Sequence, residues 1–118
     1  MGRIIHTTNP TRLRNLAIKK MISAIREFLR SPKKDGELFD LGAALTVPLQ
    51  EIYESVDHSA SAWEKRDYWL KADAFRRQWS WVDKSLAGIK ASVSAKNPAG
   101  LQQQIIELGE KLGSLKVS

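Results

Sequence analysis

The chain has 118 residues, 42% of them hydrophobic and 27% charged, a balance that excludes an intrinsically disordered chain and fits a single domain over residues 1–118. It contains no cysteine, which excludes disulfides, thiol nucleophiles and thiolate metal sites. The net charge of +6 is uneven, because residues 1–34 and 65–96 are basic whereas residues 35–64 are acidic. No segment resembles a signal peptide or a membrane span, so we expect a cytoplasmic protein with no membrane partner.

The first helix is predicted over residues 10–30, after a short extended arm at residues 1–8. Asn9 can cap the free amides of its first turn, and Pro10 suits the first helical position because it has no amide proton to leave unpaired. Apolar residues at helical spacing form one broad face. A narrow basic line lies opposite: Arg12, Lys19, Arg26 and Arg30. The line is either a solvated surface or a contact for a phosphate backbone.

A second helix is predicted over residues 36–57, with an apolar heptad seam that continues past Pro48. Residues 57–60 are expected to form a turn. Ser61 and Glu64 then match the capping box, in which each side chain bonds a backbone amide of the first helical turn. The third helix is therefore predicted to begin at Ser61.

The third helix is predicted over residues 61–95, about 50 Å long, with a regular seam from Tyr68 to Val93. It carries all four tryptophans and a second apolar stripe that a monomeric bundle would leave uncovered. The residues assigned to this stripe, with one flanking arginine, are Trp63, Leu70, Ala74, Arg77 and Trp81.

A fourth helix is predicted over residues 98–116, because Asn97 and Pro98 repeat the start signal of the first helix. Four amphipathic helices joined by short loops predict an all-α fold. The expected arrangement is an up-down-up-down four-helix bundle with a long third helix and a short extended N-terminal arm.

Three interpretations of the second stripe stay open. In the first, the third helix is central and buried on two sides. In the second, the stripe binds a second copy or another protein, and in the third it stacks the bases of single-stranded nucleic acid. We expect a non-enzymatic interaction protein that forms a homo-oligomer or docks a protein partner through the stripe. The alternative is an RNA- or single-stranded-DNA-binding module that combines the basic line of the first helix with Arg76 and the tryptophans.

No catalytic, metal or cofactor motif supports an enzyme. His6 and His58 are the only histidines and fall in segments predicted to be irregular. No Glu is followed three residues later by His, and no glycine-rich phosphate loop is present. The sequence therefore predicts no catalytic residue, no metal site and no cofactor.

Overall fold

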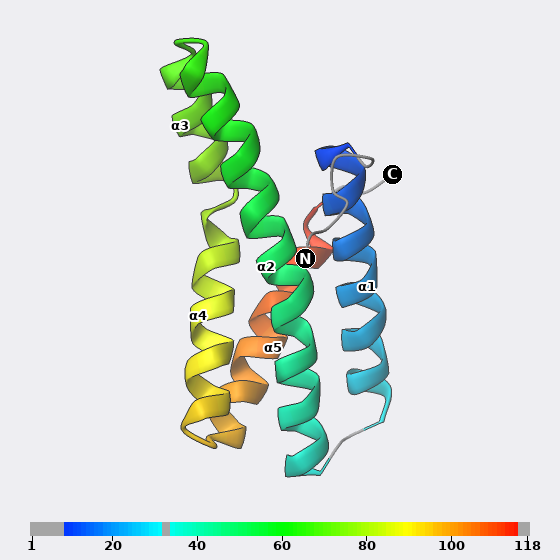
Figure 1. The fold of residues 1–118 in the computed structure, drawn as a ribbon. Coiled ribbons are helices and arrows are strands. Elements are labelled where there is room, and N and C mark those ends of the chain that lie inside the picture. Colours follow the sequence, from blue (N-terminus) through cyan, green and yellow to red (C-terminus); the bar gives the residue numbers. More distant parts are fainter. Residues whose placement is uncertain (1–8, 32–33, 116–118) are drawn as a thin grey trace, which may run out of the picture.

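The computed structural model describes residues 9–31 and 34–115, and helices make up nearly all of this part of the chain (Figure 1). The predicted all-α class is confirmed. The helices of the described residues are α1 (Pro10–Arg30), α2 (Asp35–Lys65), α3 (Trp69–Gln78), α4 (Ser80–Ser94) and α5 (Pro98–Gly113). The predicted N-terminal arm lies outside the described residues, and the last helix ends at Gly113, before the predicted end at residue 116.

The first and last helices begin where their caps predict. The side chain of Asn9 accepts a 2.8 Å hydrogen bond from the amide of Arg12, and Asn97 accepts a 3.0 Å bond from the amide of Gly100. A proline occupies the first turn of each helix. An asparagine followed by proline therefore fixes both helix starts, because the side chain replaces an absent backbone acceptor.

The predicted turn at residues 57–60 is wrong, because α2 continues through it to Lys65. No glycine or proline interrupts this segment, and Ala60 is fully buried, so packing favours continuation of the helix. The predicted capping box is wrong as well: Ser61 and Glu64 lie inside α2, where both accept hydrogen bonds from Arg76. The longest helix is therefore the second, which also runs through Pro48 without a break.

The predicted continuous helix at residues 61–95 is also wrong. Its first residues belong to α2, and the remainder is divided between α3 and α4 on either side of Trp79. Asp67 adopts a left-handed backbone conformation with φ of 64°, which a helix interior does not accept. This residue marks the true reversal of the chain, and aspartate is one of the few residues that tolerates it.

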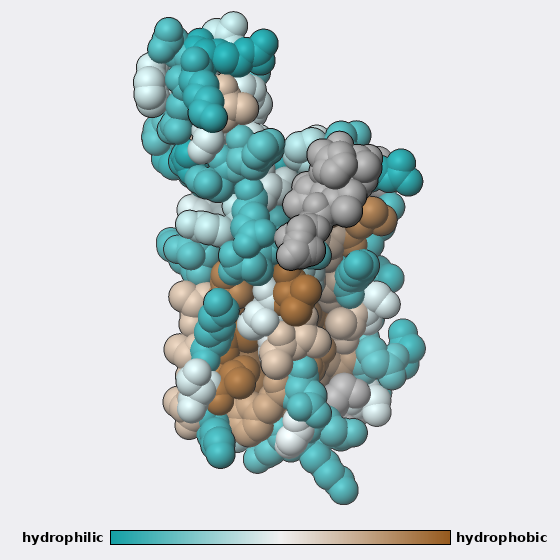
Figure 2. Space-filling model, viewed as in Figure 1, coloured by the Kyte–Doolittle hydropathy of each residue, from teal (hydrophilic) through white to brown (hydrophobic). Residues whose placement is uncertain are grey.

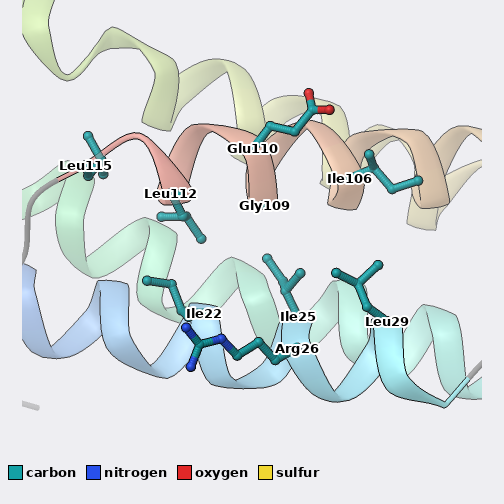
Figure 3. Close-up of a pocket in the computed structure, with 10 residues that line it drawn as sticks. Ile22, Ile25, Arg26, Leu29, Ile106, Gly109, Glu110, Leu112 and Leu115 are labelled. Carbon is teal, nitrogen blue, oxygen red and sulfur yellow. The ribbon is translucent and has the colours of Figure 1, made fainter.

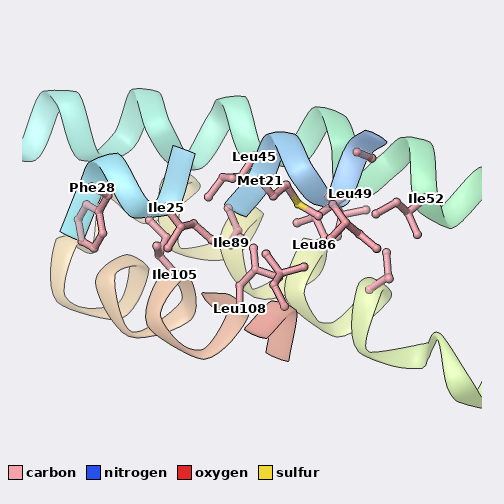
Figure 4. Packing of buried hydrophobic residues seen from close by; sticks show 14 of the residues in the cluster. Met21, Ile25, Phe28, Leu45, Leu49, Ile52, Leu86, Ile89, Ile105 and Leu108 are labelled. Atoms are coloured by element: carbon pink, nitrogen blue, oxygen red, sulfur yellow. The ribbon is translucent and has the colours of Figure 1, made fainter. Parts of the chain in front are cut away.

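The helices pack around α2, which contacts each of the other four. α3 and α4 run back along α2 in succession, and α5 lies between α4 and α1 (Figure 1). Buried aliphatic side chains from α1, α2, α4 and α5 fill the core, as Figure 4 shows for Met21, Leu49, Ile89 and Leu108. α3 lies farther along α2 and adds only Ala72 to the fully buried set.

The end of α2 and the whole of α3 form a helical hairpin that projects past α1 (Figure 1). The hairpin stands clear of the other helices in the space-filling view, while hydrophobic residues gather lower on the same face (Figure 2). Within the described ranges, no helix is both long and apolar enough to cross a membrane.

Candidate functional site

Three consecutive side chains are exposed at the outer end of the hairpin: Tyr68, Trp69 and Leu70, here called the tip. Trp69 is 60% exposed and Leu70 is 86% exposed, whereas Tyr68 is about half exposed. Surfaces of folded proteins carry single exposed apolar residues routinely, but three in succession on a projecting turn form a patch.

The turn behind the tip is fixed by the backbone. The amides of Arg66 and Tyr68 both donate to the carbonyl oxygen of Trp63, at 3.0 and 2.9 Å. Both bonds go to one carbonyl oxygen in the last turn of α2, which would otherwise be left unpaired. Together with the left-handed backbone at Asp67, they reverse the chain so that α3 begins at Trp69. The tip is therefore presented on an ordered turn.

Behind the tip, aromatic rings form a continuous chain toward the bundle. Trp63 meets Phe75 edge-on with ring centroids 5.0 Å apart, Phe75 lies 6.3 Å from Trp79, and Trp79 lies 5.8 Å from Trp81. Such pairs add to the free energy of burial because ring edges and faces carry opposite partial charge. This aromatic chain (Trp63, Phe75, Trp79 and Trp81) joins α2, α3 and the start of α4.

A buried arginine from α1 closes over this aromatic chain. Arg14 is only 8% exposed, donates a 2.8 Å hydrogen bond to the hydroxyl of Ser55, and lies over the rings of Phe75 and Trp79 at 5.0 and 5.5 Å. Burial lowers the pKa of the Arg14 guanidinium from its ordinary value. All thirteen Asp and Glu side chains lie in the described ranges, and none forms an ion pair with Arg14 there. The ring faces and Ser55 therefore stabilise the buried cation in place of a carboxylate.

The five predicted partner-binding residues fall into two groups, one half buried and one exposed. Trp63 and Trp81 are half buried in the aromatic chain, where Lys71 and Lys111 lie over their rings at 4.6 and 6.0 Å. Leu70, Ala74 and Arg77 remain exposed on one side of α3, because residues four and seven apart share a helix face.

The sequence pattern misplaced Tyr68, which the predicted seam assigned to the core and which is in fact exposed. Trp69 is not among the residues of the predicted stripe, yet it belongs to the most exposed group. Asp67 tolerates a left-handed turn, but so does Asp57, which lies inside α2, so residue type alone does not locate the tip.

Arg76 does not join the basic line of α1. Its guanidinium donates to Asp57 at 2.7 Å and to Glu64 at 3.3 Å, and so binds α3 to the end of α2. The hydrogen bond to Asp57 is the largest cause that raises the pKa of Arg76 above its ordinary value. The predicted combination of Arg76 with the arginines of α1 is therefore not brought together.

The basic line of α1 is exposed along its length, as predicted from its spacing. Arg12, Lys19 and Arg26 form no ion pair within the described residues, whereas Arg30 pairs with Glu27 at 3.4 Å. A shallow depression of about 470 Å³ follows this face of α1. It is lined by Lys19, Ile22, Ser23, Arg26, Glu27 and Arg30.

A groove of about 530 Å³ separates α1 from α5 (Figure 3). Here called the α1–α5 groove, it is lined by Ile22, Ile25, Arg26, Leu29, Ile106, Gly109, Glu110, Leu112, Gly113 and Leu115. It adjoins the basic depression, because Ile22 and Arg26 line both. Its floor is aliphatic, and its two charged residues stand on opposite helices.

Catalytic and metal-binding groups are not clustered in the part of the chain that the structure describes. His58 is exposed on α2, and His6 falls outside the described residues. No group of three or more histidine, aspartate or glutamate side chains that could hold a metal ion occurs in residues 9–31 and 34–115.

Comparison with known proteins identifies no relative. No family model matches the chain, and neither a curated protein nor a solved structure is similar to it at a significant level. Function is therefore argued from the surfaces described above.

Proposed function

We propose that this protein is a non-enzymatic interaction module that docks another protein through the tip. The exposure of Trp69 and Leu70 on a projecting, ordered turn is the observation that carries the proposal. Large apolar side chains that a partner covers contribute most to the free energy of binding, and tryptophan is enriched among the residues that dominate it. The turn is held in shape before binding, so little conformational entropy is lost on docking.

Residues farther along α3 border the same surface. Ala74 and Arg77 continue the exposed side of α3 beyond Leu70, and Arg77 forms an ion pair with Asp73. An apolar centre with a charged border is the arrangement found in protein interfaces, where the border excludes water. The proposed surface, made by the tip, Ala74 and Arg77, keeps three residues of the predicted stripe and has Tyr68 and Trp69 in place of Trp63 and Trp81.

The docking proposal can be tested by cross-linking in extracts of the native cell. The protein would carry a photoreactive amino acid at Lys71, beside the tip, and adducts would be identified by mass spectrometry. We expect a specific adduct that is lost in the double variant Trp69→Ser/Leu70→Ser. The matched control, Leu16→Ser/Val47→Ser, removes two exposed apolar side chains elsewhere and should retain the adduct. An adduct that survives in the tip variant, or the absence of any adduct when the photoreactive protein has an intact tip, would refute tip docking.

A second candidate function is nucleic-acid binding by α1. The specific observation is that Arg12, Lys19 and Arg26 are exposed on one helix face without an ion-pair partner among the described residues. Three free cations in a line can neutralise phosphates and release counterions, which makes affinity fall steeply with salt. A salt titration with single-stranded RNA and DNA tests this: binding that is absent at low salt, or unchanged by salt, removes the candidate.

The proposed fold is a variant of the predicted up-down-up-down bundle. α3 and α4 follow one another along α2 and together take the position expected for one long third helix. The cytoplasmic location and the assignment of the chain as a single domain stay predictions.

A further inference from the structure

The floor of the α1–α5 groove is apolar and open. Leu29 is 65% exposed, and Ile106 is also among the exposed large apolar side chains of the described residues. Ile22 and Ile25 continue this surface along α1 (Figure 3). Water at such a surface is displaced favourably by another apolar surface, at about 25 cal/mol for each Å² covered.

The two walls of the groove carry opposite charges at the same position along the helix axes. α1 and α5 run in opposite directions, so that Ile22 lies near Leu112 at one end and Leu29 near Ile106 at the other (Figure 3). Arg26 and Glu110 stand between these ends, one on each helix. Neither forms an ion pair within the described residues.

We propose that the α1–α5 groove is covered by a second copy of this chain, related by a two-fold axis that runs parallel to the helices. Such a rotation exchanges the two walls, so that α1 of each copy faces α5 of the other. The rotation leaves the position of each residue along the helix axis unchanged, so each Arg26 lies opposite Glu110 of the second copy. The aliphatic floors of the two grooves then close over one another, and two equivalent ion pairs border them.

Other occupants fit the groove less well. A two-fold axis perpendicular to the helices would place Arg26 against Arg26 and Glu110 against Glu110, which is repulsive. Nucleic acid needs rings on which bases can stack, and the residues that line the groove include no aromatic side chain. A second copy supplies both the apolar surface and the opposite charges at matching positions.

The size of this surface predicts a weak dimer. Two helices side by side over the length of α5 cover roughly 20 by 24 Å, or about 1,000 Å² when both copies are counted. That is at the lower limit of specific interfaces, so we expect the monomer and the dimer to exchange with concentration. The interface lies away from the tip and does not depend on the proposed docking function.

A charge-reversal cycle tests the proposal. Sedimentation equilibrium at about 0.15 M salt, over a range of concentrations, would give the dimer dissociation constant. Arg26→Glu and Glu110→Arg should each raise it roughly tenfold, because each change creates two like-charge pairs. The double variant Arg26→Glu/Glu110→Arg should restore it to within about threefold of the original.

The apolar floor is tested with a matched pair of exposed positions. Leu29→Lys introduces a charge into the floor and should abolish dimerisation, while Val47→Lys, at a similarly exposed position of α2, should leave it unchanged. Circular dichroism would confirm that each variant remains helical. The tip variant Trp69→Ser/Leu70→Ser should dimerise normally, which separates this proposal from docking at the tip.

Three results would overturn the proposal. A particle that remains monomeric at every concentration excludes the second copy, and binding of RNA that prevents dimerisation assigns the groove to nucleic acid. Failure of the double charge reversal to restore a dimer weakened by the single changes would show that Arg26 and Glu110 do not pair.

Discussion

The guanidinium of Arg14 donates a 2.8 Å hydrogen bond to the hydroxyl of Ser55, and so joins α1 to α2 inside the bundle. The same guanidinium lies over Phe75 and Trp79, which come from the end of α3 and the break that follows it. One buried side chain therefore connects the first helix to the base of the hairpin that carries the tip.

Replacing Arg14 is expected to destabilise the fold according to the volume removed. Arg14→Ala should lower the free energy of unfolding by about 2 to 4 kcal/mol, because it leaves a cavity against the rings and Ser55 without its partner. Arg14→Met should cost less than about 1.5 kcal/mol, since its side chain fills most of the space without a buried charge. Urea denaturation measures both. Equal losses for the two variants would show that the charge, and not the volume, stabilises this junction.

Arg76 is expected to hold α3 against α2 without contributing much to global stability. Its side chain is more than a third exposed, so solvent screens its ion pairs with Asp57 and Glu64. In Arg76→Gln, the backbone amides of α3 should exchange with solvent faster, while those of α4 and α5 should be little changed. Arg77→Gln removes an arginine from the same helix whose ion pair with Asp73 lies within α3, and serves as the control. Uniform acceleration across the chain would contradict a local role for Arg76.

Pro48 is expected to limit the stability of α2. It lies inside a continuous 31-residue helix and supplies no amide proton, so the carbonyl oxygen of Ala44 lacks its helical donor. Pro48→Ala should raise the free energy of unfolding by about 1 to 3 kcal/mol, measured by thermal or urea denaturation. A loss of stability would mean that the core packs against a bend which the proline maintains.

Gly42 is expected to be essential to the approach of α2 to its neighbours. A Cβ atom there would lie 3.0 Å from side-chain carbons of Leu101 and Val93, so these side chains must shift to admit a larger residue. Gly42→Leu should lower the free energy of unfolding by about 1 to 3 kcal/mol. Gly36, also on α2, has no atom within 4 Å of an added Cβ, so Gly36→Leu should be nearly neutral. Similar effects of the two changes would show that the close approach is easily relieved.

Local chemistry made the starts of the first and last helices predictable. Asn9 and Asn97 act within one helical turn, so the starts of α1 and α5 follow directly from the sequence. Most of the predicted seam of the third helix was also correct, since Val82, Leu86 and Ile89 are buried in the core. Periodicity identifies the buried face of a helix even where the helix itself is broken.

Distant contacts made the middle of the chain unpredictable. Ser61 and Glu64 have the spacing of a helix start, but Arg76 from α3 binds both, and the helix continues. The break at Trp79 has no glycine or proline to signal it, and Trp79 instead packs against Phe75, Trp81 and Arg14. The predicted stripe is divided for the same reason, because Trp63 and Trp81 pack against Phe75 and Trp79 within the chain.

The continuity of α2 has a geometric consequence. This single helix is about 46 Å long and contacts both the core and α3, so it continues without a break from the bundle into the hairpin. α2 would therefore set the distance between a protein docked at the tip and a second copy of the chain that covers the α1–α5 groove.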